Sequence, residues 1–272
     1  MKRQRLNWQE KVKKNVRKIM DFEHVKAVFE EYLNGYDREN DKVKLKIVHT
    51  YGVIRCSEEI GRRMGLQAED MELAKLIALL HDIGRFEQLK RFNSFEADTM
   101  DHATYGVQVL FEEGMIRQFI EEDTWDDVIR TAIAKHSDYE LTGITDERTL
   151  LHARLIRDAD KLDNCRVKLE DAMETLLDLS ADEVGKYAIS PKVREDAFAG
   201  KCICSKDRRT PMDYWVSYVA YFYDLNFQET LDIVAEEQYV KRIIGRVPYT
   251  NEQTKKTMEE LERQLTEYVR RK

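Results

Sequence analysis

Apolar residues recur along most of this chain at steps of three and four residues, which is the spacing of one face of a helix. Alternation of apolar and polar residues, the pattern of a half-buried strand, is scarce. The three prolines stand at positions 191, 211 and 248, so no proline interrupts the first 190 residues. The pattern therefore predicts an all-α chain that forms a bundle of helices.

Capping residues and glycines set the ends of the predicted helices. Asp41 and Thr124 are candidate N-caps of the second and fifth helices, and Gly84 is expected to end the third in a left-handed conformation. The longest predicted helix is expected to break near Asn164. The predicted helices span about 8–33, 41–64, 69–84, 101–113, 124–136, 146–179, 191–198, 211–222, 227–245 and 252–272, with a short element at 115–120 and loops at 85–99 and 200–210.

The composition fits this prediction and argues against several classes of protein. Apolar residues make up 42% and charged residues 36% of the 272 residues, which suits amphipathic helices and not a disordered chain. With 52 acidic and 45 basic side chains, the net charge of −7 does not suggest a nucleic-acid-binding protein. No apolar run approaches the roughly 18–20 residues that span a bilayer, and the basic N-terminus lacks the apolar stretch of a secretory signal. We therefore expect a cytoplasmic protein with no membrane partner and no clear nucleic-acid partner.

Two polar sites interrupt apolar helical segments in the first third of the chain. His49 lies on the same helix face as the apolar residues four positions before and after it. Farther along, the apolar run at 74–80 leads directly into His81 and Asp82. An aspartate is costly to bury unless it is paired or bound to a metal, so this pair can converge on one cation.

Further residues of the same types lie at the ends or on the inner faces of predicted helices. Asp160 and Asp163 share one face with apolar residues, which favours Asp160 as a ligand and Asp163 as a group that orients a ligand. His102 begins a helix after a loop, and His136 closes an apolar run. Each residue alone is more often structural than functional. Together, four histidines and two aspartates can hold two divalent cations, with Asp82 bridging them.

In chain order, His49, the segment 81–84 and Asp160 resemble the H…HD…D signature of the HD superfamily of metal-dependent phosphohydrolases. The segment 79–84 is similar to the central motif of that family, and the segment 160–163 is similar to its closing motif. The similarity identifies the superfamily. It does not identify the substrate.

The resemblance covers about 41–170 and implies an HD-domain-like helical bundle with additional N- and C-terminal helices. We expect a single domain over 1–272, with a C-terminal helical extension at about 171–272. One or two divalent ions are implied for each chain, and mixed nitrogen and oxygen ligands admit Fe, Mn, Ni, Co, Zn or Mg. The implied ligands are His49, His81, Asp82 and Asp160 for one metal, with His102 and His136 at the positions that binuclear members use for a second.

The sequence departs from the cyclic-di-nucleotide phosphodiesterase branch of the family. It has no GYP triplet, and His136 stands alone where that branch has a His-His pair. Arg85 and Lys161 flank the motifs and are expected to contact phosphate, with surface salt bridges as the alternative. Asp101 and Glu87 are further candidates for orienting ligands or moving protons.

The implied reaction is hydrolysis of a phosphomonoester or phosphodiester by water that the metal activates. A nucleotide is the favoured small-molecule substrate, and Asp82, Arg85 and Lys161 are the expected catalytic residues. One alternative is a mixed-valence di-iron oxygenase of the same superfamily. The other is a non-catalytic module that senses a nucleotide or a metal.

The C-terminal third leaves two questions open. Its many aromatic residues between 214 and 227 either form a packed core or line a site for a ring-shaped substrate. Its last helix has one apolar side, which could dock on the same chain or on a partner. A homo-oligomer is therefore left open.

Overall fold

The computed structural model describes residues 20–96 and 98–271, and within these ranges it contains helices and no strand. The prediction of an all-α chain is confirmed. The part of the first predicted helix that precedes residue 20 lies outside the described residues. No helix of the described ranges combines the length and the apolar composition needed to cross a membrane.

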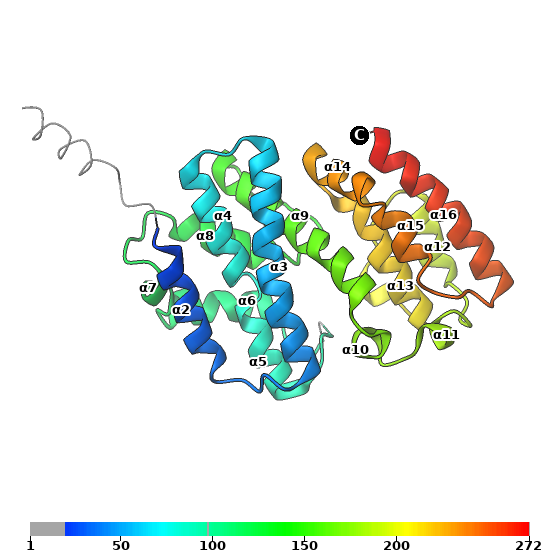
Figure 1. Cartoon of the computed structure of the whole chain (residues 1–272), viewed down its shortest axis with the longest axis horizontal. Coiled ribbons are helices and arrows are strands. Elements are labelled where there is room, and N and C mark those ends of the chain that lie inside the picture. The colour runs from blue at the N-terminus through cyan, green and yellow to red at the C-terminus, as the bar shows by residue number, and fades with distance from the viewer. Residues whose placement is uncertain (1–19, 97, 272) are drawn as a thin grey trace, which may run out of the picture.

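The helices form two groups that are joined by a long central helix, α9 (Figure 1). The N-terminal group, with α9 as its last member, comprises α2 (Phe22–Leu33), α3 (Asp41–Met64), α4 (Ala68–Leu80), α5 (Ile83–Phe92), α6 (His102–Val107), the π-helix η1 (Gln108–Glu112), α7 (Ile116–Phe119), α8 (Asp126–Lys135) and α9 (Glu147–Glu170). The C-terminal group comprises α10 (Met173–Leu177), α11 (Ala181–Val184), α12 (Pro191–Phe198), η2 (Ser205–Asp207), α13 (Pro211–Ala220), η3 (Tyr221–Asp224), α14 (Gln228–Glu236), α15 (Tyr239–Ile244) and α16 (Glu252–Arg271).

The ends of α3 follow local capping rules. The Asn40 side chain accepts hydrogen bonds from the backbone N–H groups of Lys42 and Val43, so the N-cap lies one residue before the predicted Asp41. Gly65 ends the helix with φ 71°, a left-handed conformation that glycine adopts without steric cost. The bounds of α3 therefore agree with the prediction.

The prediction for the third helix is wrong at its C-terminal end. Helix α4 ends at Leu80, His81 and Asp82 form a break, and α5 continues to Phe92 through most of the predicted loop. Gly84 is not a left-handed cap. It lies in the first turn of α5, where a Cβ atom would collide with the carbonyl oxygen of His102. A glycine is needed here because α5 and α6 pack closely, and local sequence does not reveal that contact.

Three other predicted boundaries are also corrected. Helix α8 begins after Trp125 without a side-chain cap, so Thr124 does not cap it. Helix α9 runs unbroken through Asn164 and ends at Glu170, and α10 follows after a short interruption. The predicted helix at 227–245 is divided by Gln238, whose φ of 53° is left-handed.

The apolar core extends through both groups of helices. In α4, Leu76, Leu79 and Leu80 have no exposed surface, and in α13 Trp215 has none. The apolar side of α16, which includes Leu261 and Leu265, is buried against α12, α14 and α15 of the same chain. Burial of this side answers the question that the sequence left open, because α16 docks within its own chain.

Candidate metal centre

Side chains from five segments of the N-terminal group meet at one buried position. Helix α3 contributes one of them, the break between α4 and α5 two, and the start of α6, the end of α8 and the middle of α9 one each. We call this set the ligand cluster: His49, His81, Asp82, His102, His136 and Asp160. All six were predicted from the sequence, and the fold brings them together.

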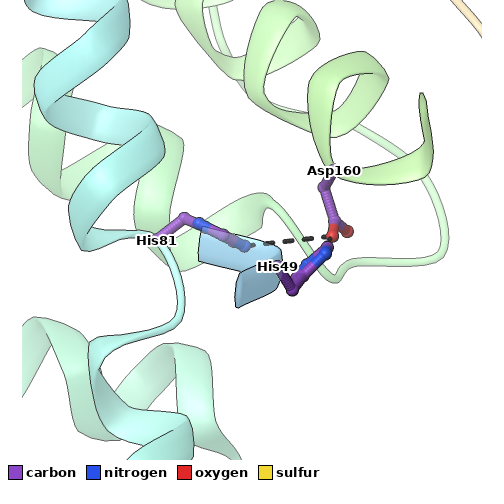
Figure 2. A group of neighbouring side chains, drawn as sticks. All are labelled: His49, His81 and Asp160. Carbon is purple, nitrogen blue, oxygen red and sulfur yellow. Dashed lines mark hydrogen bonds and ion pairs between the residues drawn. The ribbon is translucent and has the colours of Figure 1, made fainter. Parts of the chain in front are cut away.

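One half of the ligand cluster is formed by His49, His81 and Asp160 (Figure 2). The Nε2 atom of His49 lies 2.9 Å from Oδ1 of Asp160, and Nε2 of His81 lies 3.9 Å from the same oxygen. Both histidines are buried, and the Asp160 side chain is 22% exposed. These three residues could hold a metal ion, since one ligand atom of each lies within 4.8 Å of the others.

The other half is centred on the Asp82 carboxylate. Oδ1 of Asp82 lies 3.2 Å from Nε2 of His102 and 3.6 Å from Nε2 of His136, and Oδ2 lies 3.5 Å from Nε2 of His81. The Nε2 atoms of His102 and His136 are 3.1 Å apart. His81, Asp82 and His136 form a second set that could hold a metal ion, and His81 belongs to both sets.

Two ligand histidines are oriented by their own helices. Nδ1 of His81 lies 2.8 Å from the carbonyl oxygen of Ala78, and Nδ1 of His136 lies 2.7 Å from that of Ile133. A carbonyl oxygen only accepts hydrogen bonds, so each Nδ1 carries the proton and each Nε2 presents a lone pair to the cluster. This is the tautomer that a metal ligand needs.

His49 is oriented by a carboxylate in the way predicted for Asp163. Nδ1 of His49 lies 2.8 Å from Oδ2 of Asp163, and Arg166 donates two hydrogen bonds of 2.9 Å to the same carboxylate. Gly52 faces Asp163, and any Cβ atom at that position would overlap its carboxylate. Sequence reasoning missed Gly52, although a glycine inside a helix, three residues after a candidate ligand, is a usable signal.

Two atoms of the ligand cluster fit a divalent cation because no donor satisfies them. Among the described residues, the buried atoms Nε2 of His81 and Oδ1 of Asp82 have no hydrogen-bond partner. An unsatisfied buried acceptor is costly, and a cation shared by several acceptors removes that cost. Imidazole nitrogens and carboxylate oxygens are ligands that first-row divalent metals accept.

The electrostatic environment keeps two carboxylates and one histidine of the ligand cluster in a metal-binding form. Burial alone would raise the pKa of Asp82, but the charges of Lys46 and His81 outweigh it and hold the pKa well below its usual value. Asp160 likewise has a lowered pKa, because its hydrogen bond and charge interaction with His49 outweigh burial. Burial and the neighbouring Arg85 lower the pKa of His102 to about 3. Both carboxylates are therefore ionised and His102 is neutral near pH 7.

Two positively charged side chains contact the ligand cluster. Nζ of Lys46 lies 2.5 Å from Oδ2 of Asp82, and Arg85 donates a 2.9 Å hydrogen bond to Nε2 of His102. Lys161, which was predicted to contact phosphate, forms a 2.8 Å ion pair with Asp224. Lys46 was missed from the sequence, although it lies one helical turn before a candidate ligand and therefore on the same face.

Asp101 and Glu87, the two further candidates for orienting ligands or moving protons, lie in different surroundings. Asp101 caps α6 by accepting hydrogen bonds from the backbone N–H groups of Ala103 and Thr104, so it fixes the start of the helix that carries His102. Glu87 instead pairs with Arg91 at 2.6 Å, on the outer face of α5. The geometry does not place Glu87 at the ligand cluster.

A cavity of about 700 Å³ opens next to the ligand cluster. Asp82, His102, His136 and Asp160 line it on one side. The C-terminal group also lines it, with Cys202, Ile203, Cys204, Arg208, Tyr214, Tyr218, Tyr221 and Asp224. Of the aromatic segment, Trp215 and Phe222 are therefore core residues, whereas the three tyrosines lie in the cavity wall, and a site for a ring-shaped substrate stays a prediction.

Comparison with known protein families gives one match. The family model described as HD domain matches residues 47–165, a range that contains the whole ligand cluster. No curated protein and no solved structure matches the chain.

Proposed function

We propose that this chain is a metal-dependent phosphohydrolase of the HD superfamily, because its residues 47–165 match the HD domain family model. The proposed substrate is a phosphomonoester or a phosphodiester, with a nucleotide as the favoured class. The observation that carries the proposal is the position of the ligand cluster. It lies beside a cavity whose wall also includes the positively charged side chains of Lys46 and Arg85.

The metal-binding part of the proposal is supported by the two sets that share His81. Divalent ions bound there would polarise a phosphoryl oxygen and lower the pKa of a bound water molecule. The chain itself supplies the ligands in the required tautomers, and it keeps Asp82 and Asp160 ionised. These features suit binding of one or two ions in each chain.

The phosphate-binding part is supported by Arg85 and Lys46. Both side chains are mostly buried, and both line the cavity beside Asp82. A guanidinium group can hold two oxygens of a phosphoryl group at once, whereas an ammonium group acts as a point charge. We infer that the two cations orient the substrate and stabilise the negative charge of its reacting group. Lys161 would contribute less because Asp224 neutralises it.

The size and the walls of the cavity support a nucleotide. A volume of about 700 Å³ is within the range of roughly 300–1,000 Å³ that is typical of small-molecule sites. Tyr214, Tyr218 and Tyr221 line the same cavity as the ligand cluster, and tyrosine rings pack well against flat aromatic groups. A base could therefore contact these rings while its phosphate lies near the metal ions.

The decisive experiment is a phosphate-ester screen on protein of measured metal content. The panel should contain nucleoside mono-, di- and triphosphates, cyclic nucleotides and p-nitrophenyl phosphate, each tested with Mn²⁺, Co²⁺, Ni²⁺, Zn²⁺, Mg²⁺ and Fe²⁺. We expect phosphate release or diester cleavage that requires a divalent ion and proceeds without oxygen. Turnover that depends on iron and oxygen would instead indicate an oxygenase. No hydrolysis of any compound by metal-loaded protein would contradict the proposal and favour a sensor.

A further inference from the structure

Lys168 lies near the C-terminal end of α9 and lines the cavity, but it is not adjacent to the ligand cluster. The residue is only 7% exposed. Its Nζ atom lies 3.4 Å from Oδ1 of Asn164 and 3.9 Å from the centre of the Tyr218 ring. Within the described ranges of the chain, no carboxylate oxygen lies within 4.0 Å of this nitrogen.

This lack of a counter-ion distinguishes Lys168 from the other lysines of the cavity. Lys46 pairs with Asp82, and Lys161 pairs with Asp224. A buried ammonium group without an ion-pair partner has lost water and gained a weak hydrogen bond, a cation–π contact and the more distant attraction of Asp160 and Asp171. Burial and the nearby charge of Lys46 lower the pKa of Lys168 to about 8, so the side chain is still mostly charged at pH 7. A charged group maintained at this cost is suited to bind an anion that enters the cavity.

The position of Lys168 indicates which part of a ligand it would meet. Asp160, Asn164 and Lys168 follow one another at steps of four residues along one face of α9, and the Asn164 amide donates a 2.9 Å hydrogen bond to Oδ1 of Asp160. The Asn164 amide therefore bridges the two side chains, since Nζ of Lys168 donates a 3.4 Å hydrogen bond to its oxygen. One amide group separates the Lys168 ammonium group from the ligand cluster, so an anion held by Lys168 would lie next to a phosphoryl group held at the cluster.

We propose that Lys168 binds a second phosphate group of the substrate, a group that does not react. This inference rests on the proposed phosphohydrolase function for the identity of the first group. It narrows the substrate class to molecules that carry two phosphate groups several bonds apart, or a chain of phosphates. The Tyr218 ring contacts the ammonium group and helps to fix its position.

Binding of two compounds that cannot be hydrolysed tests this inference. Propane-1,3-diphosphonate carries two anionic groups, and propylphosphonate carries one. Their affinities should be measured by calorimetry on metal-loaded full-length protein, for the wild type, Lys168→Met and Lys192→Met. Lys192 is the matched control, since it is 57% exposed and pairs with Asp196.

We expect the wild type and Lys192→Met to bind the diphosphonate about ten- to a hundredfold more tightly than the monophosphonate, as a charged hydrogen bond would provide. Lys168→Met should lose this preference and retain its affinity for the monophosphonate. It should also melt at a higher temperature than the wild type without ligand, because a buried charge has been removed. Equal weakening of both compounds, no change in Lys168→Met, or no preference in the wild type would each overturn the inference.

The result is separate from the test of the proposed function. A binding preference that depends on Lys168 would survive even if the protein hydrolysed no phosphate ester. Conversely, hydrolysis could be confirmed while the diphosphonate shows no advantage. If Lys168→Met failed to fold, Lys168→Gln would answer the same question with an uncharged side chain that can still hydrogen-bond.

Discussion

The N-terminal group of helices, α2–α9, and the C-terminal group, α10–α16, bury different kinds of side chain. The N-terminal group contributes every residue of the ligand cluster, and four of the buried residues are histidines of that cluster. The buried charged residues of the C-terminal group are Asp196 and Asp213, and Asp213 accepts hydrogen bonds from the backbone of Ser190 and Arg209. We infer that the first group provides the proposed chemistry and that the second provides the wall that selects the substrate.

A small number of contacts ties the two groups together at the cavity. Arg157 on α9 donates hydrogen bonds to the carbonyl oxygens of Lys135 and His136 and forms a 2.6 Å ion pair with Asp224. The neighbouring Asp158 accepts hydrogen bonds from the backbone N–H groups of Asn226 and Phe227. The position of a candidate ligand is thereby linked to the C-terminal wall.

The largest effect is expected from Asp82→Ala. This change removes the carboxylate that lies against three histidines, so both ions should be lost. Elemental analysis should show metal at background level. Activity should fall by more than the roughly 10–100-fold that is typical when a residue that only hydrogen-bonds to a metal ligand is replaced. Asp182→Ala, at an exposed position in α11, is the control and should retain metal. Unchanged metal content in Asp82→Ala would rule out its bridging role.

His136→Ala should affect one half of the ligand cluster and leave the other half intact. His136 belongs to the set with His81 and Asp82, whereas the set with His49 and Asp160 does not contain it. The variant should therefore retain one ion where the wild type binds two, as measured by elemental analysis and by titration with Mn²⁺. If the wild type already binds a single ion, the binuclear interpretation is wrong and His102 and His136 are structural.

Asp163→Asn should weaken the ligand cluster without removing a ligand. The His49 ring would lose its charged hydrogen-bond acceptor, and the affinity for metal should fall by roughly 10–100-fold. Competition with a chelator measures this change. Glu170→Gln is a suitable control because it alters a different carboxylate that contacts Arg166, one whose side chain is 64% exposed. Equal affinities in Asp163→Asn and the wild type would assign Asp163 a purely structural role.

Asp224→Ala should give the smallest effect on metal content and a moderate effect on stability. It leaves Arg157 and Lys161 without their shared carboxylate, and Arg157 is almost fully buried. Because Asp224 is itself 25% exposed, the free energy of unfolding should fall by about 2 kcal/mol, below the value for a fully buried pair. Denaturant titration gives this number. A large loss of metal in the same variant would contradict the division of roles between the two groups.

The sequence by itself determined the all-α fold and most of the helices, and it predicted the six side chains that the fold brings together as the ligand cluster. These features depend on periodicity, on caps such as Gly65 and on the change from an apolar run to the pair at 81–82, all of which involve residues within a few positions of each other. The predicted boundary at Gly84 was wrong because this glycine serves the close contact between α5 and α6 and does not end a helix. The predicted break at Asn164 was wrong because α9 continues through that residue.

Only the tertiary structure decided which polar groups meet. His49 and Asp163 are 114 positions apart, and their contact depends on how α3 packs against α9. The same packing places Asp160 beside His49, while Asp158 points to the C-terminal group and binds its backbone. It also leaves Lys168 without a counter-ion in the cavity wall. Local patterns cannot contain this information, because the burial and the partner of a charge are set by helices that are distant in sequence.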